Sequence, residues 1–578
     1  MWAHTFFIIF RIVPSGQRTI SIIMRFRSVV LSLLFGITPS VSFAQNQVNG
    51  SLAANNVLLP QLLHDNPNTS IFYNALIATG LNDTLQQYLD PTYPEIDYEW
   101  TEQALRDNYE GIHLFETAYE TGDNADRIAY PEKREFKFTI FCMPDAALAN
   151  YSDAYTVAAG LNGIHNLAEL KRYAETVYPE GAGQDDKLRT SSLNKFISYH
   201  ILPCWLSYDQ FNTSQIGIIY RRLYLTELDV EDFFETLLPH SIMRISTPYS
   251  ENRAGSAIGI YINRKGTQST GLIAEGARIA KDANEYNLSE SFTNICINGG
   301  YYYINKLLAY DDYTRNTILN TRIRIMACTL SPDFINSHGR GRLNGDPNNA
   351  RIKNIDKMVM AYLPGFCKNV KWSDDTKFYV RYRDRSFGTY YGDEMTIRGK
   401  YDITFRLPPV PADGLYEIRV WNNSLAGSSF NDRGTILFYL GKEGEDFIPC
   451  GTPVDMRLGL YDSLIGSIPD NDERYDNLTD QQRQAAIDAN DKALHKRGYM
   501  KAPDSYTQSY SNDNTGDPMR VAWGVYRKII CEHFLEAGKD YYLRLRQVAN
   551  LDATFPFCFV EIVPYSVYSG ENGPEDKH

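Results

Sequence analysis

The sequence is poor in cysteine, with eight in 578 residues, and none of them stands at C-x-x-C or C-x-x-H spacing. The usual zinc and thioredoxin-type sites need closely spaced ligands, so neither is expected. Positive charge is also scarce, because 57 Lys and Arg face 70 Asp and Glu and leave a formal charge of −13. Nucleic acids and anionic membranes are bound by basic faces, and this chain is expected to bind neither.

Long apolar runs are missing after the first 44 residues, so no transmembrane helix is expected there. Met24–Arg27 is basic, an apolar run follows, and Ser42-Phe43-Ala44 has the small-x-small pattern that signal peptidase accepts. The apolar run itself is too short for a permanent anchor. The sequence therefore predicts a leader over 1–44, with its signal peptide at 24–44, and export to the periplasm, the cell surface or the medium.

The cysteines also bear on the compartment, because export permits disulfides. Cys142, Cys296 and Cys558 nevertheless lie inside apolar strand patterns. In such positions cysteine is more often a small buried hydrophobic residue. We therefore expect mostly free, buried thiols, and the pairing of any disulfide stays open.

Three stretches, in a fixed order, organise the first half of the chain. Thr139–Leu148 has the pattern of a buried strand, a proline turn and the start of a helix. Leu193–Leu202 is a helical pattern that contains the dipeptide Tyr199-His200, and Asn298–Leu308 is an Asn-Gly turn followed by an apolar strand. Amphipathic spacing predicts further helices over 69–80 and 166–174.

This order of motifs resembles the fasciclin domain, an extracellular adhesion and binding module. The resemblance implies an α+β fasciclin-like domain over 55–310, with insertions, after a linker at 45–54. It also implies that Tyr199, His200, Asn298 and Gly299 are hallmark residues, and it leaves the Tyr-His pair either an adhesive or a core role. The apolar neighbours of His200 favour a hydrogen-bonded place in the core.

The second half shows repeated alternation of apolar and polar residues, which predicts many short strands and few helices. In the strand over 415–421, Tyr416, Ile418 and Val420 are expected on one face, with Glu417 and Arg419 pointing outward. The order of strands resembles a galactose-binding-like jelly roll. We therefore predict a connector with the first strands over 311–370, an all-β jelly-roll sandwich domain over 371–568 and a tail over 569–578.

A polar insertion over 461–519 interrupts this β pattern. Thr479 and Gln482 form a capping box for a helix that Gly498 is expected to stop. The acidic run that begins at Asp470 suggests calcium, but it lacks the ligand spacing and the glycine of an EF-hand. A solvated loop is the favoured interpretation.

Three functions are compatible with the sequence. The first is an exported, non-enzymatic adhesion protein with a protein partner at the cell surface. The second is an accessory carbohydrate-binding protein of a glycan-uptake system, because aromatic side chains such as Tyr390, Tyr391 and Trp421 can contact sugars. The third is a glycosidase with paired carboxylates, although no G-x-S-x-G or other catalytic signature is present. We expect a non-enzyme with no cofactor and no metal, and the oligomeric state stays open.

Overall fold

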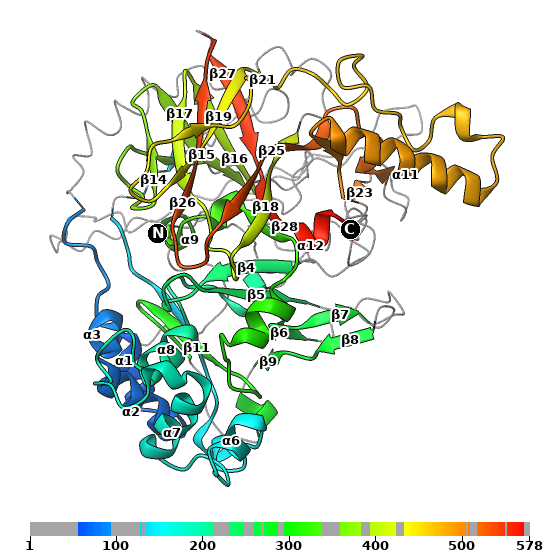
Figure 1. Cartoon of the computed structure of the whole chain (residues 1–578). Coiled ribbons are helices and arrows are strands. Elements are labelled where there is room, and N and C mark those ends of the chain that lie inside the picture. The colour runs from blue at the N-terminus through cyan, green and yellow to red at the C-terminus, as the bar shows by residue number, and fades with distance from the viewer. Residues whose placement is uncertain are drawn as a thin grey trace, which may run out of the picture. The chain divides into compact units, whose positions relative to one another are not determined.

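Helices gather in the first half of the chain and strands dominate the second (Figure 1). The leader, the linker up to residue 54 and most of the tail lie outside the residues that the structure describes. The computed structural model describes residues 56–93, 128–129, 131, 133–211, 231–247, 259–267, 271–281, 283–286, 294–337, 359–382, 393–423, 433–503, 507–508, 517–549 and 552–570.

The helices of the first half begin and end at residues with clear local causes. Asn166 and Ser191 accept backbone N–H groups and begin the two amphipathic helices. Gly80, with φ 70°, ends the helix before it in the left-handed conformation. The helices are α1 (Leu59–His64), α2 (Ser70–Thr79), α3 (Leu81–Leu85), α5 (Asp145–Leu148), α6 (Ala154–Ala158), α7 (Leu167–Val177) and α8 (Ser192–Tyr199).

These helices pack on a sheet in which two motifs of the sequence meet. Strand β2 (Phe138–Cys142) pairs in parallel with β11 (Gly299–Tyr303), with β10 (Ile295–Cys296) and β3 (Ile201–Leu202) on the two sides. All residues of β2 and β11 are buried, as expected for parallel strands covered on both faces. The sequence predicts an apolar strand that continues to Leu308, but β11 ends at Tyr303.

The two faces of β11 point into two different cores. Tyr301 and Tyr303 pack with the helices, whereas Tyr302 packs with an antiparallel sheet of shorter strands. That sheet has the order β4 (Glu231–Glu235), β5 (Ile242–Ser246), β6 (Ile260–Ile262) and β9 (Ala277–Ile279).

The second half contains three sheets that share one hydrophobic core. The described residues are rich in β-structure, as predicted, and the arrangement fits a β-sandwich. The first sheet is β1 (Ile128–Ala129), β13 (Val359–Tyr362), β15 (Thr376–Tyr382), β16 (Asp393–Gly399) and β27 (Ala553–Phe557). The second is β12 (Ile323–Met326), β28 (Phe559–Pro564), β18 (Gly414–Asn423), β25 (Val525–Leu535) and β22 (Tyr499–Lys501). The third is β14 (Val370–Trp372), β17 (Asp402–Arg406), β26 (Tyr541–Gln547), β19 (Thr435–Lys442) and β20 (Ile448–Pro449), with β21 (Val454–Asp455) paired to β19.

The prediction that Glu417 and Arg419 point outward from β18 is wrong. Both side chains are buried, and so is the opposite face of the strand. Arg419 Nη2 lies 2.6 Å from Glu417 Oε2, and His495 of α11 (Asp480–Lys496) reaches the same carboxylate at 3.1 Å. Later segments of the chain cover this face, so β18 is buried on both sides.

The insertion folds around α11, drawn in orange in Figure 1. Its capping box between Thr479 and Gln482 is confirmed, and Gly498 with φ 82° follows the helix end. Asp470 differs from the expected solvated loop, because Lys501 Nζ lies 2.5 Å and Arg520 Nε 2.8 Å from its carboxylate. Across the described part of the chain, helices fall short of the length and apolar character that crossing a membrane requires.

Candidate functional site

Tyr199 and His200 lie in the core at the end of α8. The His200 Nδ1 atom lies 2.8 Å from the carbonyl oxygen of Phe196, and the backbone N–H of Leu308 donates to Nε2 at 3.1 Å. The Tyr199 hydroxyl donates to the Ile242 carbonyl at 3.2 Å. Because both ring nitrogens of His200 have backbone partners, its Nδ1 carries the proton and the ring links α8 to the segment after β11.

Burial lowers the pKa of His200 to about 4, although its hydrogen bond to Phe196 acts in the opposite direction. An unfolded histidine titrates near 6.5, so the unfolded chain binds the proton first as the pH falls. We therefore expect the unfolding free energy to drop by roughly 3 kcal/mol between pH 7 and pH 4 through this group. Urea unfolding at a series of pH values measures this loss.

Two histidine variants test that expectation. His200→Gln should flatten the pH dependence between pH 6.5 and 4, because no imidazole remains to be protonated at this position. His165→Gln, at an exposed position, should keep the wild-type pH profile. An unchanged slope in His200→Gln would show that the buried imidazole is not the group responsible.

Asn298 joins three elements of the first half, two through its side chain and one through its backbone carbonyl. Its Oδ1 accepts the backbone N–H of Leu59 at 2.8 Å, and its Nδ2 donates to the carbonyl of Leu85 at 2.6 Å. The Asn298 carbonyl accepts the Phe138 N–H at 2.9 Å. Gly299 follows with φ 134°, and a Cβ there would lie 1.9 Å from the Phe138 oxygen. The four hallmark residues therefore link elements of the first half, and all four are buried.

The expectation that Trp421 offers its ring to a glycan is wrong. The side chain is 0% exposed and packs against Phe559, with ring centroids 4.7 Å apart. It shares the covered face of β18 with Arg419, which explains why alternation alone misplaced it. Tyr390 and Tyr391, the other aromatic candidates, lie outside the described residues.

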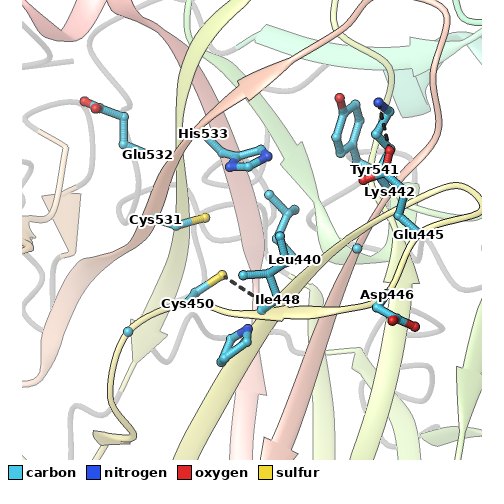
Figure 2. A pocket seen from close by; sticks show the side chains of 13 residues that line it. Leu440, Lys442, Glu445, Asp446, Ile448, Cys450, Cys531, Glu532, His533 and Tyr541 are labelled. Atoms are coloured by element: carbon cyan, nitrogen blue, oxygen red, sulfur yellow. Dashed lines mark hydrogen bonds and ion pairs between the residues drawn. The ribbon is translucent and has the colours of Figure 1, made fainter.

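The pocket drawn in Figure 2 lies between β19 and β25, which belong to different sheets. It has a volume of about 250 Å³. Lys442 at its rim forms ion pairs with Glu445 at 3.1 Å and with Glu536 at 2.5 Å. The chemistry-bearing side chains around it are Lys442, Glu445, Asp446, Cys450, Cys531, Glu532, His533 and Tyr541.

An aromatic and charged surface lies on the outer face of the third sheet. The Arg544 guanidinium lies over the rings of Tyr439 and Phe447, at 5.4 and 5.9 Å from their centroids. It also binds both carboxylate oxygens of Asp402, at 2.7 and 2.6 Å. Phe447 is 36% exposed and lies close to Gly441, where a Cβ would come within 2.8 Å of its ring. We call Asp402, Tyr439, Phe447 and Arg544 the aromatic surface.

Neither the pocket nor the aromatic surface follows from the sequence. Cys450 and Cys531 are 81 positions apart in the chain, and no local spacing connects them. Tyr439 belongs to a predicted strand, but its face depends on the partner strands β26 and β20. Gly441 gives a limited signal, because a glycine in a strand often marks the close approach of another group. The sequence does not identify that group.

The comparisons with known proteins do not assign this chain to a family. A scan against protein-family models gives no match for this chain, and a search of the curated proteins gives none either. Within the described ranges, His, Cys, Asp and Glu side chains do not gather in groups of three or more that could hold a metal ion. The function must therefore be argued from the geometry.

Proposed function

We propose that this chain is an exported, non-enzymatic binding protein of the fasciclin type, with a protein partner at the cell surface and a jelly-roll second domain. The observation that carries the proposal is the parallel pairing of β2 with β11, Ile140 opposite Tyr301. The first and third motifs of the resemblance are neighbours in one sheet. The second motif, α8 with Tyr199 and His200, is joined to both of the other motifs.

Two hydrogen bonds link α8 to the other two motifs. The Phe141 N–H donates to the His200 carbonyl at 2.9 Å, and the Leu308 N–H donates to the His200 ring after β11 has ended. The three motifs thus form one packed unit. Since the polar atoms of the hallmark residues are committed to this unit, binding is expected at surfaces that the unit supports, and its role is that of a scaffold.

A bead assay tests adhesion directly. Beads coated with the purified chain should adhere to cells of the producing organism more than albumin-coated beads, and an excess of soluble chain should remove the difference. Protease treatment of the cells should abolish adhesion if the partner is a protein. Retention equal to that of albumin beads would refute the proposal.

The second candidate is glycan binding by the aromatic surface, which a specific arrangement favours. An exposed ring beside a bidentate Arg–carboxylate pair offers both an apolar platform and polar groups, the combination that recognises sugar rings and hydroxyls. Phe447→Ala should then reduce retardation of the chain in polysaccharide affinity gels by at least about threefold, as expected from the loss of roughly 1 kcal/mol of ring contact. Phe534→Ala, at another exposed phenylalanine, is the matched control.

The bead assay on periodate-treated cells distinguishes a protein partner from a glycan partner. Periodate oxidation destroys the vicinal diols of glycans and leaves most proteins able to bind, so it should abolish adhesion only if a glycan is the partner. A chain that no polysaccharide retards would count against the glycan candidate. The glycosidase has the least support, because Glu445 and Glu532, two acids at the pocket, already accept contacts from Lys442 and from Tyr568.

A further inference from the structure

Two of the eight cysteines differ from the others in exposure and in surroundings. Cys450 and Cys531 are partly exposed, whereas the other six are buried. Both line the pocket between β19 and β25, and Figure 2 shows their sulfur atoms facing the same space. The two side chains are close enough for each to shift the pKa of the other, and the Cys450 thiol donates to the Ile448 carbonyl at 3.9 Å.

The backbone holds the pair in place from two sheets. The Cys450 N–H donates to the Phe438 carbonyl at 2.8 Å, which fixes the residue at the end of β20. Cys531 pairs with Ile418 on β18 just where the register shifts, since Arg419 pairs with Ile529. Such a bulge re-aims the side chains beside it, and here Cys531 turns toward the pocket. Both side chains also pack on the shared core of the second half.

From this geometry we propose that Cys450 and Cys531 are a redox-active dithiol, which closes to an intersheet disulfide by exchange with a small-molecule disulfide that enters the pocket. The proposal is independent of the binding function above. It does not concern the six buried cysteines, whose thiols a reagent in solvent cannot reach without opening the core.

The exchange proceeds in two balanced steps. The Cys450 thiolate attacks one sulfur of the disulfide R–S–S–R, forms a mixed disulfide and releases one thiolate RS⁻. Cys531 then loses its proton and attacks the Cys450 sulfur, which expels the second RS⁻. Two cysteine thiols are oxidised, and the small disulfide is reduced to two thiols after protonation.

The order of attack follows from the different surroundings of the two thiols. Their mutual contact lowers the pKa of Cys450 and raises the pKa of Cys531, and burial adds to the rise at Cys531. The thiolate is the nucleophile in exchange, so Cys450 attacks first and Cys531 resolves. The resulting bond would close a loop that contains the whole insertion 461–519, and it would join the third sheet to the second.

Oxidised glutathione is the probe for the test. The full chain, purified reduced and then incubated with oxidised glutathione, should lose 2 Da, and thiols titrated after denaturation should fall from eight to six. Peptide mapping without reductant should link the peptides that contain Cys450 and Cys531. A chain that keeps eight thiols, or forms its disulfide between other cysteines, would overturn the proposal.

Single variants test the assigned roles. Cys531→Ser should stop at a mixed disulfide on Cys450, and Cys450→Ser should react at Cys531 at least about tenfold more slowly than the wild type does at Cys450. Cys142→Ala, in the buried strand β2, should still lose two thiols. Equal reactivity of Cys531 in Cys450→Ser would refute the order of attack. The wild-type peptide map does not depend on whether these variants fold.

Discussion

Gly299→Ala is expected to lower the unfolding free energy by about 3 kcal/mol or more. Gly299 has φ 134°, a conformation that side chains rarely adopt. The added Cβ would also lie 1.9 Å from the Phe138 carbonyl oxygen, which is backbone and cannot swing aside. Relief of this clash requires β2 and β11 to separate.

Urea unfolding followed by far-UV circular dichroism measures the effect, and two other glycines separate its causes. Gly538 has φ 81° with open space around it, so Gly538→Ala should cost only about 1 kcal/mol of backbone strain. Gly414→Ala meets only an ordinary contact with Tyr416 at 3.5 Å and should be close to neutral. A Gly299→Ala chain as stable as Gly538→Ala would contradict the close parallel pairing on which the proposed function rests.

Glu561→Gln is expected to destabilise the second half by about 3–5 kcal/mol. The substitution removes the negative charge of Glu561 from a row of buried, oppositely charged side chains. Glu561 is fully buried on β28, directly opposite Arg324 on β12 and Arg419 on β18. Arg324 Nη2 lies 2.6 Å and Arg419 Nη1 3.4 Å from its oxygens. In the variant these guanidiniums would keep their positive charges beside a neutral amide.

The pH dependence of this effect has a definite sign. Burial alone would raise the pKa of Glu561, but the Arg324 guanidinium, with those of Arg527, Arg322 and Arg419, holds it well below its usual value of 4.5. The stabilisation is therefore complete above pH 4.5 and is lost as the pH falls toward the folded-state pKa. The difference in unfolding free energy between wild type and Glu561→Gln should shrink over that range.

An exposed ion pair provides the control for Glu561→Gln. Asp552 pairs with Arg398 at 3.1 Å, and its side chain is 54% exposed. Because solvent and salt screen such pairs, Asp552→Asn should change the unfolding free energy by less than about 1 kcal/mol. If the two variants are equally stable in urea at pH 7, the buried row does not stabilise the second half.

Local features of the fold were predictable from the sequence because their causes lie within a few residues. The capping box of Thr479 and Gln482 joins positions three residues apart, and the stop at Gly80 depends on one backbone conformation. The alternating burial of β17 likewise follows from its own pattern. Each of these features depends only on residues that are close to one another in the sequence.

The cap of α2 shows where local reasoning ends. Serine is a common N-cap residue, but Ser70 is the first helical residue of α2, and its N–H donates to the Asp145 carboxylate at 3.0 Å. The residue that satisfies this helix start is 75 positions away and belongs to the motif after β2. No pattern around Ser70 contains that information.

The sequence by itself indicated the alternation of strands such as β17, the start of α11 and the glycines that follow α2 and α11. Only the tertiary structure decided which faces are covered. It buried Glu417, Arg419 and Trp421 under later segments and brought Cys450 to Cys531 across two sheets. The physical reason is that an alternating pattern fixes which side chains share a face, whereas the burial of that face depends on the segment that packs against it.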